Sequence, residues 1–394
     1  DPRPSRTALP WLVLCAGLAL SLTSWLTLRA TLKREKAARF QRLGERVTTA
    51  VRARFEMAAQ IAQGAATFLE WRGEELTQAE WAHYVNGVKR LFPEGVVGIA
   101  FVQRVPRERI DEVESEVQAD GRPSFRVQRG GSGPWAYVVT HIEPMQQNAR
   151  ALGADFLVGT GRRAVAADQA VRADELTLTS RIGVYVADQD VPGFLLLAPV
   201  FRPNTLRGDL AGREAGLQGW ASVALLTEAL LAGITEQAEG QVDFAVFEGE
   251  KVDQSTLIDV RTSGTRGAMS DWDGTERAFL SRSQKSVLPL NLRGHRWTLW
   301  LVSTPRFDAQ AGRLVAWLIL IGGLFASAGG ALPASSLARK RSLAVQHAER
   351  VTEDLSRSEA NAQRLALVAS GTASAVILAD TAWRIQWINE SFTR

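Results

Sequence analysis

The sequence predicts an α+β fold held between two membrane-spanning helices. Two uncharged apolar runs, residues 8–28 and 314–332, bracket most of the chain, and about 20 apolar residues in a helix cross a hydrocarbon core. Between these runs, short β-rich segments alternate with short helical segments, a pattern typical of antiparallel sheets capped by helices. Beyond the second run, regularly spaced apolar residues predict a coiled coil over residues 337–366.

The composition narrows the class of protein. The chain has 394 residues, 46% hydrophobic and 22% charged, which excludes a disordered chain and a transporter with many spans. One cysteine excludes a disulfide framework and a cysteine-built zinc site, and four scattered histidines argue against a histidine-built metal centre. The net charge of +4 is spread along the chain, so it does not indicate nucleic-acid binding. We expect no metal, no cofactor and no nucleic-acid partner.

The charges beside the spans predict the topology. Arg339, Lys340 and Arg341 follow the second span, and such clusters mark the cytoplasmic side. Because two spans put both ends on one side, residues 1–7 and the segment after residue 332 are expected in the cytoplasm, with residues 30–312 outside a plasma (inner) membrane. The alternative for residues 8–28 is a cleaved signal peptide, but the run exceeds the usual apolar core of about 7–15 residues.

The outer segment is expected to begin with a stalk helix over residues 30–70, because apolar residues recur there at spacings of four and three. Further helices are expected from Pro106, after Pro144, over residues 164–172 and just before Gly233, with a charged loop after residue 247. The expected strands are residues 96–104, 124–129, 135–142, 176–186, 193–201, 219–225, 242–247 and 296–303.

The segment after the second span has a helical repeat. Residues from Ala344 to Leu365 keep spacings of four and three, which predicts a heptad seam with few large apolar side chains. Such a seam suits a signalling coiled coil that joins two copies in a parallel homodimer. The alternative is a surface helix with small residues. Residues 373–394 contain two strand-like runs around a turn and are too few for a domain.

Two short motifs resemble functional sites but lack the sequence context that those sites require. Residues 159–164 read GTGRRA, but no strand–helix–strand unit surrounds them, as a dinucleotide site requires. His347 lies on the cytoplasmic helix without the glutamate and proline context of a phospho-accepting histidine. We therefore expect no catalytic centre within these residues.

Residues 141–182 hold the candidate binding residues. Glu143 ends an apolar strand and precedes Pro144, so its carboxylate is expected near a pocket mouth. Asp155 follows Gly153 closely, as a capping or turn residue does. Thr177 and Thr179 alternate on one face of the next strand.

Taken together, these residues resemble the CHASE domain, the extracellular sensory module of cytokinin receptors and of many bacterial sensor proteins. The resemblance covers about residues 30–312. The matching residues are Glu143, Pro144, Asn148, Leu152, Gly153, Asp155, Arg162, Arg163, Ala164, Ala170, Leu178, Thr179, Gly193, Phe194, Pro199 and Val200.

The resemblance implies two stacked PAS-like antiparallel-sheet units on the long helix: a distal one over residues 96–201 and a proximal one over residues 219–304. It also implies a small ligand in the distal unit. Glu143 is the closest match to the acidic residue that binds adenine in plant receptors, and Thr179 matches a pocket-lining threonine. Thr177 and Phe101 complete the expected ligand-binding set, while Asn148, Gly153, Asp155 and Arg163 are expected to be structural. A surface ion pair is the alternative for Glu143.

The tail over residues 367–394 resembles the start of a PAS domain, with Asp380, Asn389 and Phe392 at pattern positions. These resemblances imply the input region of a membrane receptor for a small molecule, with cytokinin-like adenine derivatives as the family precedent. The expected output is a histidine kinase that signals to a response regulator. The alternatives are a diguanylate cyclase or phosphodiesterase output, or a chemoreceptor-type adaptor without enzymatic activity.

Overall fold

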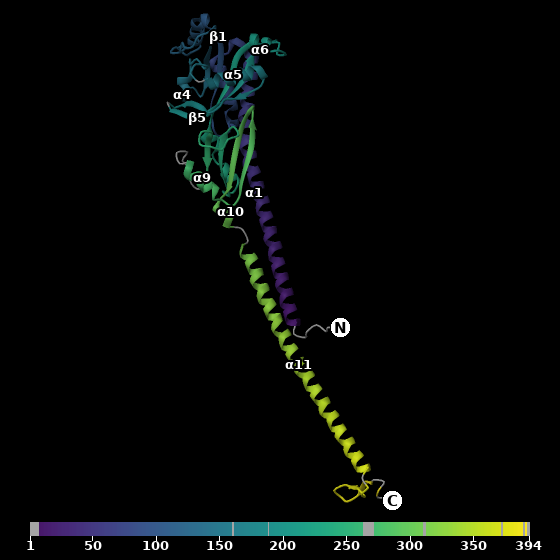
Figure 1. Ribbon diagram of the computed structural model, residues 1–394. Coiled ribbons are helices and arrows are strands. Elements are labelled where there is room, and N and C mark those ends of the chain that lie inside the picture. Colours follow the sequence, from purple (N-terminus) through teal and green to yellow (C-terminus); the bar gives the residue numbers. More distant parts are fainter. Residues whose placement is uncertain are drawn as a thin grey trace. The chain divides into compact units, whose positions relative to one another are not determined.

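A computed structural model describes residues 8–159, 161–187, 189–262, 272–309, 313–371, 373–388 and 391 of the chain (Figure 1). The chain divides into two compact units, one comprising Lys33–Ala311 and the other the residues up to Leu32 together with those from Gly312 onward.

The helices are two long ones, α1 and α11, and shorter ones between the strands. They are α1 (Ala8–Arg72), α2 (Gln78–Val88), α3 (Ile110–Ala119), α4 (Met145–Asn148), α5 (Gly161–Ala173), α6 (Leu210–Gly216), α7 (Thr227–Leu231), α8 (Ile234–Gln237), α9 (Trp272–Leu280), α10 (Pro305–Ala309) and α11 (Arg313–Gly371). Short 3-10 turns are Gly73–Glu75, Lys89–Leu91, Arg107–Arg109 and Ala149–Ala151.

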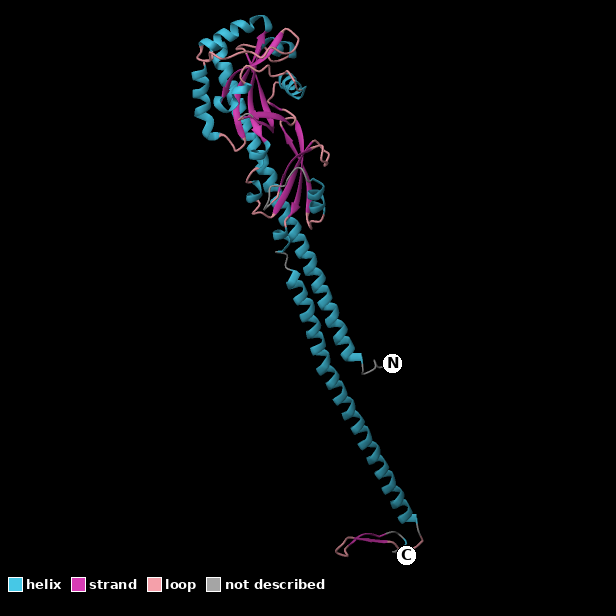
Figure 2. Ribbon diagram, turned by 90° about the vertical axis from the view of Figure 1, so that its left-hand side faces the viewer, coloured by secondary structure: helices cyan, strands magenta, loops and turns pink. Residues whose placement is uncertain are grey.

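The strands form antiparallel sheets, which confirms the α+β prediction. They are β1 (Val96–Pro106), β2 (Trp135–Glu143), β3 (Thr177–Leu178), β4 (Ile182–Val186), β5 (Gln189–Phe201), β6 (Leu217–Leu226), β7 (Val242–Glu248), β8 (Leu257–Arg261), β9 (Lys285–Leu292) and β10 (His295–Ser303) in the larger unit, and β11 (Ile377–Ala379) and β12 (Ile385–Ile388) in the other. A six-stranded sheet has the order β2-β1-β6-β5-β3 with β4 paired to β5, and a four-stranded sheet has the order β8-β7-β10-β9 (Figure 2).

In the larger unit, α1 packs against both sheets. Its inward face carries the apolar stripe that the sequence predicts, and Val47, Val51, Ala58 and Ala62 are fully buried. This stripe shares one core with Ile99 and its neighbours in the six-stranded sheet, and with residues such as Phe244 and Leu299 in the four-stranded sheet. Because strand side chains alternate in direction, each sheet also has an opposite face with its own packing.

The two opposite faces pack against different elements. On the six-stranded sheet, Val102, Leu195 and Trp220 form a second core with residues of α5. On the four-stranded sheet, a separate core surrounds Phe247 and Trp300 and includes Trp272 and Phe279 of α9.

Residues 124–129 do not form the strand that their alternating pattern predicts. Phe125 and Val127 are buried against α3, which accounts for the alternation without a sheet. Their backbone is satisfied locally: Val127 N–H donates to the Glu114 carboxylate at 2.7 Å, and Gln128 N–H donates to the Gly153 carbonyl at 2.8 Å.

The region after β7 is more ordered than the expected charged loop. It contains β8, α9 and β9. β9 lies at the edge of its sheet and contains Pro289, and an edge strand tolerates proline because one side of its backbone needs no ladder partner. Most of the TSGTRG segment falls within residues 263–271, outside the described residues.

Two helical segments are long and apolar enough to span a membrane, Trp11–Arg72 within α1 and Trp317–Val368 within α11. The first begins in the other unit and continues into the larger one, and the second lies in the other unit. Within the other unit, α11 and the part of α1 up to Leu32 approach closely through small residues. A Cβ atom added at Gly17 would collide with Ser327, and one added at Gly323 would collide with Ser21. Small residues allow such close helix contact in lipid. β11 and β12 pair around Asp380, whereas Asn389 and Phe392 lie outside the described residues.

Candidate ligand site

A cavity of about 300 Å³ lies on the face of the six-stranded sheet that points away from α1. We call it the sheet cavity. Its volume is at the small end of the range of small-molecule sites. Its lining residues are Gly98, Ala100, Val102, Gln128, Val139, Ile142, Asn148, Arg150, Ala151, Ala154, Phe156, Arg163, Gly183, Val184, Tyr185, Leu195, Ser222 and Ala224.

The cavity exists because two paired strands present small residues at the same level. Gly98 of β1 pairs with Ala224 of β6, and Ala100 pairs with Ser222. At these two levels this face of the sheet therefore carries only small side chains, and Arg163 of α5 lines the cavity as well. The intervening residues of β1, Ile99 and Phe101, point toward α1 and are buried in the main core.

Asn148 closes one end of the cavity. Its Nδ2 donates to the carbonyl oxygens of Val97 at 3.1 Å and Pro144 at 2.9 Å. A Cβ atom added at Gly98 would lie 3.0 Å from that nitrogen, so the glycine lets the amide lie over β1. These contacts agree with the structural role expected for Asn148, and the residue also lines the cavity.

The charged side chains among the described lining residues are both arginines. Arg163 of α5 is half-buried, and its Nη2 lies 3.4 Å from the Gly183 carbonyl oxygen. Burial lowers the pKa of the Arg163 guanidinium, and the nearby Asp190 carboxylate opposes that shift. Arg150 is exposed and donates a hydrogen bond to the Tyr185 hydroxyl. The cavity therefore has a positive polar side and otherwise neutral walls.

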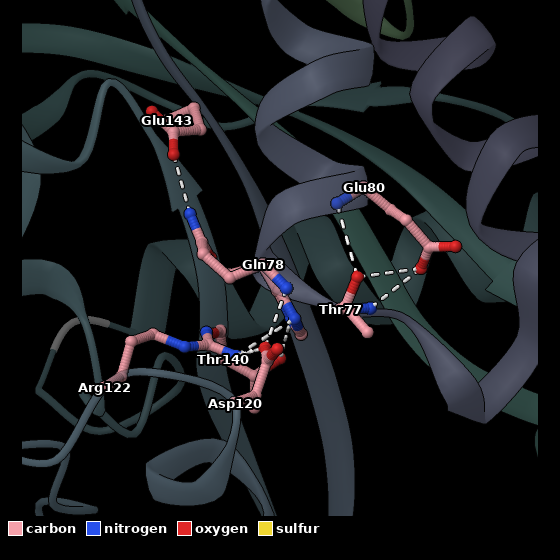
Figure 3. A network of polar contacts seen from close by, with 8 residues as sticks. Thr77, Gln78, Glu80, Asp120, Arg122, Thr140 and Glu143 are labelled. Carbon is pink, nitrogen blue, oxygen red and sulfur yellow. Dashed lines mark hydrogen bonds and ion pairs between the residues drawn. The ribbon is translucent and has the colours of Figure 1, made fainter.

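Glu143 lies outside the lining, at the end of β2 (Figure 3). Its carboxylate accepts hydrogen bonds from Gln78 Nε2 at 2.6 Å and from the Met145 backbone N–H at 3.2 Å. In Figure 3 the Gln78 side chain reaches from the first turn of α2 to Glu143. The neighbouring Thr77 and Glu80 form a capping box at that turn.

The same network continues through an ion pair between the buried Arg122 and the half-buried Asp120. The Gln78 backbone N–H donates to Asp120 Oδ2 at 2.7 Å, and Arg122 Nη2 donates to the same oxygen at 2.6 Å (Figure 3). Arg122 also donates to the Thr140 carbonyl oxygen. The network attaches the start of α2 to β2 on the α1 side of the sheet.

His141 is buried beside this network. Burial, together with the positive charge of Arg122, lowers the pKa of His141 from 6.5 to about 3. Arg122 can only donate, so the His141 Nε2 that lies 3.3 Å from its Nη2 accepts. The imidazole is therefore neutral, with its proton on Nδ1, 3.1 Å from the Thr140 hydroxyl oxygen.

The other predicted binding residues are buried and do not line the sheet cavity. The Thr179 hydroxyl accepts a hydrogen bond from the Leu195 backbone N–H at 3.0 Å. Thr177 and Thr179 flank Leu178, which packs toward α1, so both threonines lie on the sheet face that carries the cavity. Phe101 lies on the α1 side and lines a cavity of only about 30 Å³ together with His141.

The remaining predicted motif residues hold the chain between β2 and α5. Asp155 pairs with Arg107 at 3.1 Å and its other carboxylate oxygen accepts from the Tyr137 backbone N–H at 3.3 Å. Gly153 has a φ of +79°, and a Cβ atom there would collide with the Arg126 carbonyl oxygen. Only glycine avoids both problems.

Sequence reasoning did not identify Arg163, Arg150 or Tyr185 as cavity residues. Arg163 was expected to be structural, and its position beside the cavity depends on how α5 packs on the sheet. One usable signal was present: Gly98 and Ala100 place small residues on alternate positions of an otherwise bulky strand. Within the described ranges, no cluster of three histidine, cysteine or acidic side chains has the arrangement of a metal site.

Comparison with known protein families finds a match that includes strands of both sheets. A protein-family model described as the CHASE domain matches residues 74–258. No curated protein matches the chain.

Three solved structures are similar to parts of the chain. An extracellular ligand-binding receptor from Desulfohalobium retbaense DSM5692 is 13% identical, over 66% of this chain and 39% of that one, with a TM-score of 0.40. This chain thus spans about two fifths of that structure's length. A methyl-accepting chemotaxis protein X is 12% identical, over 71% and 98% of the two chains, with a TM-score of 0.33. The ligand-binding domain of the Campylobacter jejuni chemoreceptor Tlp3, in complex with 4-methylisoleucine, is 7% identical over 78% and 97%, with a TM-score of 0.25.

Proposed function

Because residues 74–258 of this chain form a CHASE domain, we propose that the chain is the input region of a membrane receptor. In this proposal the domain binds a small extracytoplasmic molecule, and the two long apolar helices carry the signal across the membrane. The observation that carries the proposal is the sheet cavity of about 300 Å³, all of whose lining residues belong to the matched segment.

The membrane topology is part of the proposal. Two helices qualify as spans by length and composition, and Arg339, Lys340 and Arg341 favour a cytoplasmic location for the segment that follows the second one. Reporter fusions at residues 200 and 345 are expected to report opposite sides of the membrane. Matching signals would overturn the two-span topology.

The output is proposed from sequence patterns alone. The seam from Ala344 to Leu365 lies within α11, and we propose that it joins two chains in a parallel homodimer. A histidine kinase paired with a response regulator is the favoured output; a diguanylate cyclase or phosphodiesterase and a non-enzymatic adaptor are the alternatives. Sequencing of the gene beyond the codon for Arg394 separates them, because a phospho-accepting histidine box indicates a kinase and GGDEF indicates a cyclase.

Ligand contact by Glu143, Thr179, Thr177 and Phe101 stays a prediction. The hydrogen bonds of Glu143 to Gln78 and Met145 support a role in holding α2. We therefore propose the sheet cavity as the primary ligand site and treat Glu143 as a competing assignment that mutation can separate from it.

A cavity-filling experiment tests the proposed site. Residues 1–394, purified in detergent, are screened for thermal stabilisation by small metabolites, including adenine derivatives; a ligand at one hundred times its dissociation constant adds about 2.7 kcal/mol. Ala100→Leu and Ala224→Leu place a larger side chain inside the cavity, whereas Ala173→Leu changes an exposed residue of α5.

The first two variants are expected to abolish the stabilisation and the third to retain it. Unchanged affinity in both filled variants would place the ligand elsewhere. A screen without any stabilising compound would argue against the proposed function as a whole.

A further inference from the structure

The strongest chemical signal in the sheet cavity is the Arg163 guanidinium. Among the described residues its one hydrogen-bond contact is long, at 3.4 Å to the Gly183 carbonyl oxygen. Its buried Nε has no hydrogen-bond partner among the described residues. A guanidinium has five N–H donors, so the half-buried head of Arg163 has donors to spare at the cavity wall. The Cζ atom of its guanidinium lies 5.4 Å from the centre of the Phe156 ring.

Four other described arginines have an unpartnered, buried Nε: three of them have a carboxylate beside the guanidinium, and the fourth has a closely stacked indole ring. They are Arg72, Arg104, Arg122 and Arg282. Arg72 and Arg122 are held by carboxylates at 2.7 and 2.6 Å, and Arg282 pairs with Asp243 at 3.9 Å. Arg104 donates to the Glu214 carbonyl and stacks 3.8 Å from the Trp135 ring. Arg163 has no carboxylate within ion-pair distance among the residues that the structure describes.

This arrangement is costly for a charged group. Burial lowers the pKa of Arg163, and Asp190 acts on it only from a distance. A buried charge without a close counter-charge is unfavourable. An anion delivered into the cavity would supply the missing partner, and a guanidinium binds a planar carboxylate through two parallel hydrogen bonds.

The rest of the cavity limits the size and charge of that anion. Its walls are mainly apolar, with Val102, Val139, Ile142, Phe156 and Leu195 around the small-residue floor. The second cation, Arg150, is exposed and already occupied by Tyr185, since its guanidinium lies 4.3 Å from the ring and donates to the hydroxyl. Among the described lining residues, Arg163 is therefore the cation available to a ligand, and one such cation matches a ligand with a single negative charge.

We infer that the sheet cavity takes a small organic carboxylate, with the carboxylate held by Arg163 and the apolar body lying over Ala100 and its neighbours. This inference rests on the proposed function and names its ligand class. A carboxylate differs from the neutral, adenine-like ligand that the sequence suggested, for which Glu143 was the expected binding residue.

Matched pairs of acids and amides test the inference. Residues 1–394 in detergent are titrated with 4-methylpentanoate and phenylacetate, and with 4-methylpentanamide and phenylacetamide, at up to millimolar concentration. The tryptophan-monitored unfolding midpoint is the readout, since Trp81, Trp220 and Trp297 are buried. At least one acid is expected to raise the midpoint while its amide does not. An amide that binds as tightly as its acid, or no response to either acid, overturns the inference.

Substitution of the arginine provides the second arm. Arg163→Gln is expected to weaken binding of the responding acid about ten- to a hundredfold, and Arg163→Lys to restore only part of the loss. Arg162→Gln is the matched control, because Arg162 is the preceding residue, carries the same charge and donates instead to the Arg181 carbonyl at 2.6 Å. Equal losses in the Gln variants of both arginines would mean that general charge, not the cavity, attracts the acid.

The two failures can be told apart. If the wide metabolite screen finds a neutral or cationic ligand that Ala100→Leu excludes, the proposed function stands and the carboxylate inference fails. If no compound stabilises the protein, both fail.

Discussion

The two sheets of the larger unit are alike toward α1 and differ on the opposite face. Toward α1 both present large apolar residues, such as Ile99 in one sheet and Phe244 in the other, to a common core. On the opposite face, the six-stranded sheet has the small residues around Ala100 and a cavity. The four-stranded sheet has Phe247 and Trp300 there, packed against α9.

The difference shows what determines whether such a sheet has room for a ligand. Trp300 of the four-stranded sheet contacts two rings of α9. Its ring lies 6.1 Å from that of Trp272 and 5.4 Å from that of Phe279, the latter in an edge-on arrangement. Aromatic side chains therefore occupy the space between the four-stranded sheet and α9, whereas small residues of β1 and β6 leave the sheet cavity on the six-stranded sheet. The filled face of the four-stranded sheet adds stability, and the open face of the six-stranded sheet leaves room for a small molecule.

The largest expected effect is on the filled face. Trp300→Ala removes the ring at the centre of the aromatic cluster, and truncation of a buried tryptophan costs about 3–5 kcal/mol of unfolding free energy. Chemical denaturation measures this loss. Ligand affinity, measured where the variant is still folded, should stay within about twofold of the parent, because distant sites act independently. A large change in affinity would show that the two faces are not independent.

Acid should affect the six-stranded sheet more than the four-stranded one. The pKa of His141 in β2 is lowered to about 3 in the folded protein, whereas the unfolded chain has a value near the ordinary 6.5. The unfolded state therefore binds the extra proton, and the stability present above pH 6.5 is lost as the pH falls toward 3. The slope is about 1.4 kcal/mol per pH unit.

Unfolding free energies between pH 7.5 and 4.5 (roughly two units below the ordinary pKa) measure this effect. His141→Gln should flatten the dependence. Burial also lowers the pKa of His295 in β10, so His295→Gln should flatten the pH dependence too. The effect should be smaller than for His141, because the His295 imidazole is only half-buried. Equal effects of the two variants would contradict the expected difference between the sheets.

A matched enlargement compares free space on the two faces. Ala245 of β7 is fully buried in the aromatic cluster, so Ala245→Leu should cost about 1–3 kcal/mol through overpacking. Ala100→Leu enters the sheet cavity and should cost less than about 1 kcal/mol. Denaturation midpoints of the two variants measure these losses of stability. A larger loss of stability for Ala100→Leu than for Ala245→Leu would mean that the cavity has no room for a larger side chain.

The smallest expected effect concerns the α1 side of the six-stranded sheet. Glu143→Ala removes the acceptor for Gln78 and Met145 and should cost about 0.5–1.5 kcal/mol. Ligand affinity should change little, in contrast to Arg163→Gln. A tenfold loss of affinity in Glu143→Ala with unchanged stability would instead favour Glu143 as the ligand contact.

The sequence predicts features that depend on one element at a time. The stripe that includes Val47 and Val51 shows directly that one face of α1 is buried, because helix periodicity needs no partner to be recognised. β9 was missed because Pro289 argues against a strand unless the strand is known to lie at an edge.

The sheet cavity depends on register between distant segments. Gly98 and Ala224 are far apart in the sequence, and only the pairing of β1 with β6 brings them together. The half-burial of Arg163 likewise depends on how α5 docks on the sheet. The small residues at alternate positions of β1 are the one local signal of the cavity, and the half-burial of Arg163 leaves none. The sequence therefore pointed to Glu143 and not to the opposite face of the sheet.

The alternation along β1 has an evolutionary consequence. Ile99 and Phe101 pack toward α1, while Gly98, Ala100 and Val102 line the cavity. A mutation at an even-numbered position of this segment alters what the cavity accepts and leaves the contact with α1 in place. Under the proposed function, one short stretch of codons can therefore diversify ligand preference while selection on the odd-numbered positions preserves the fold.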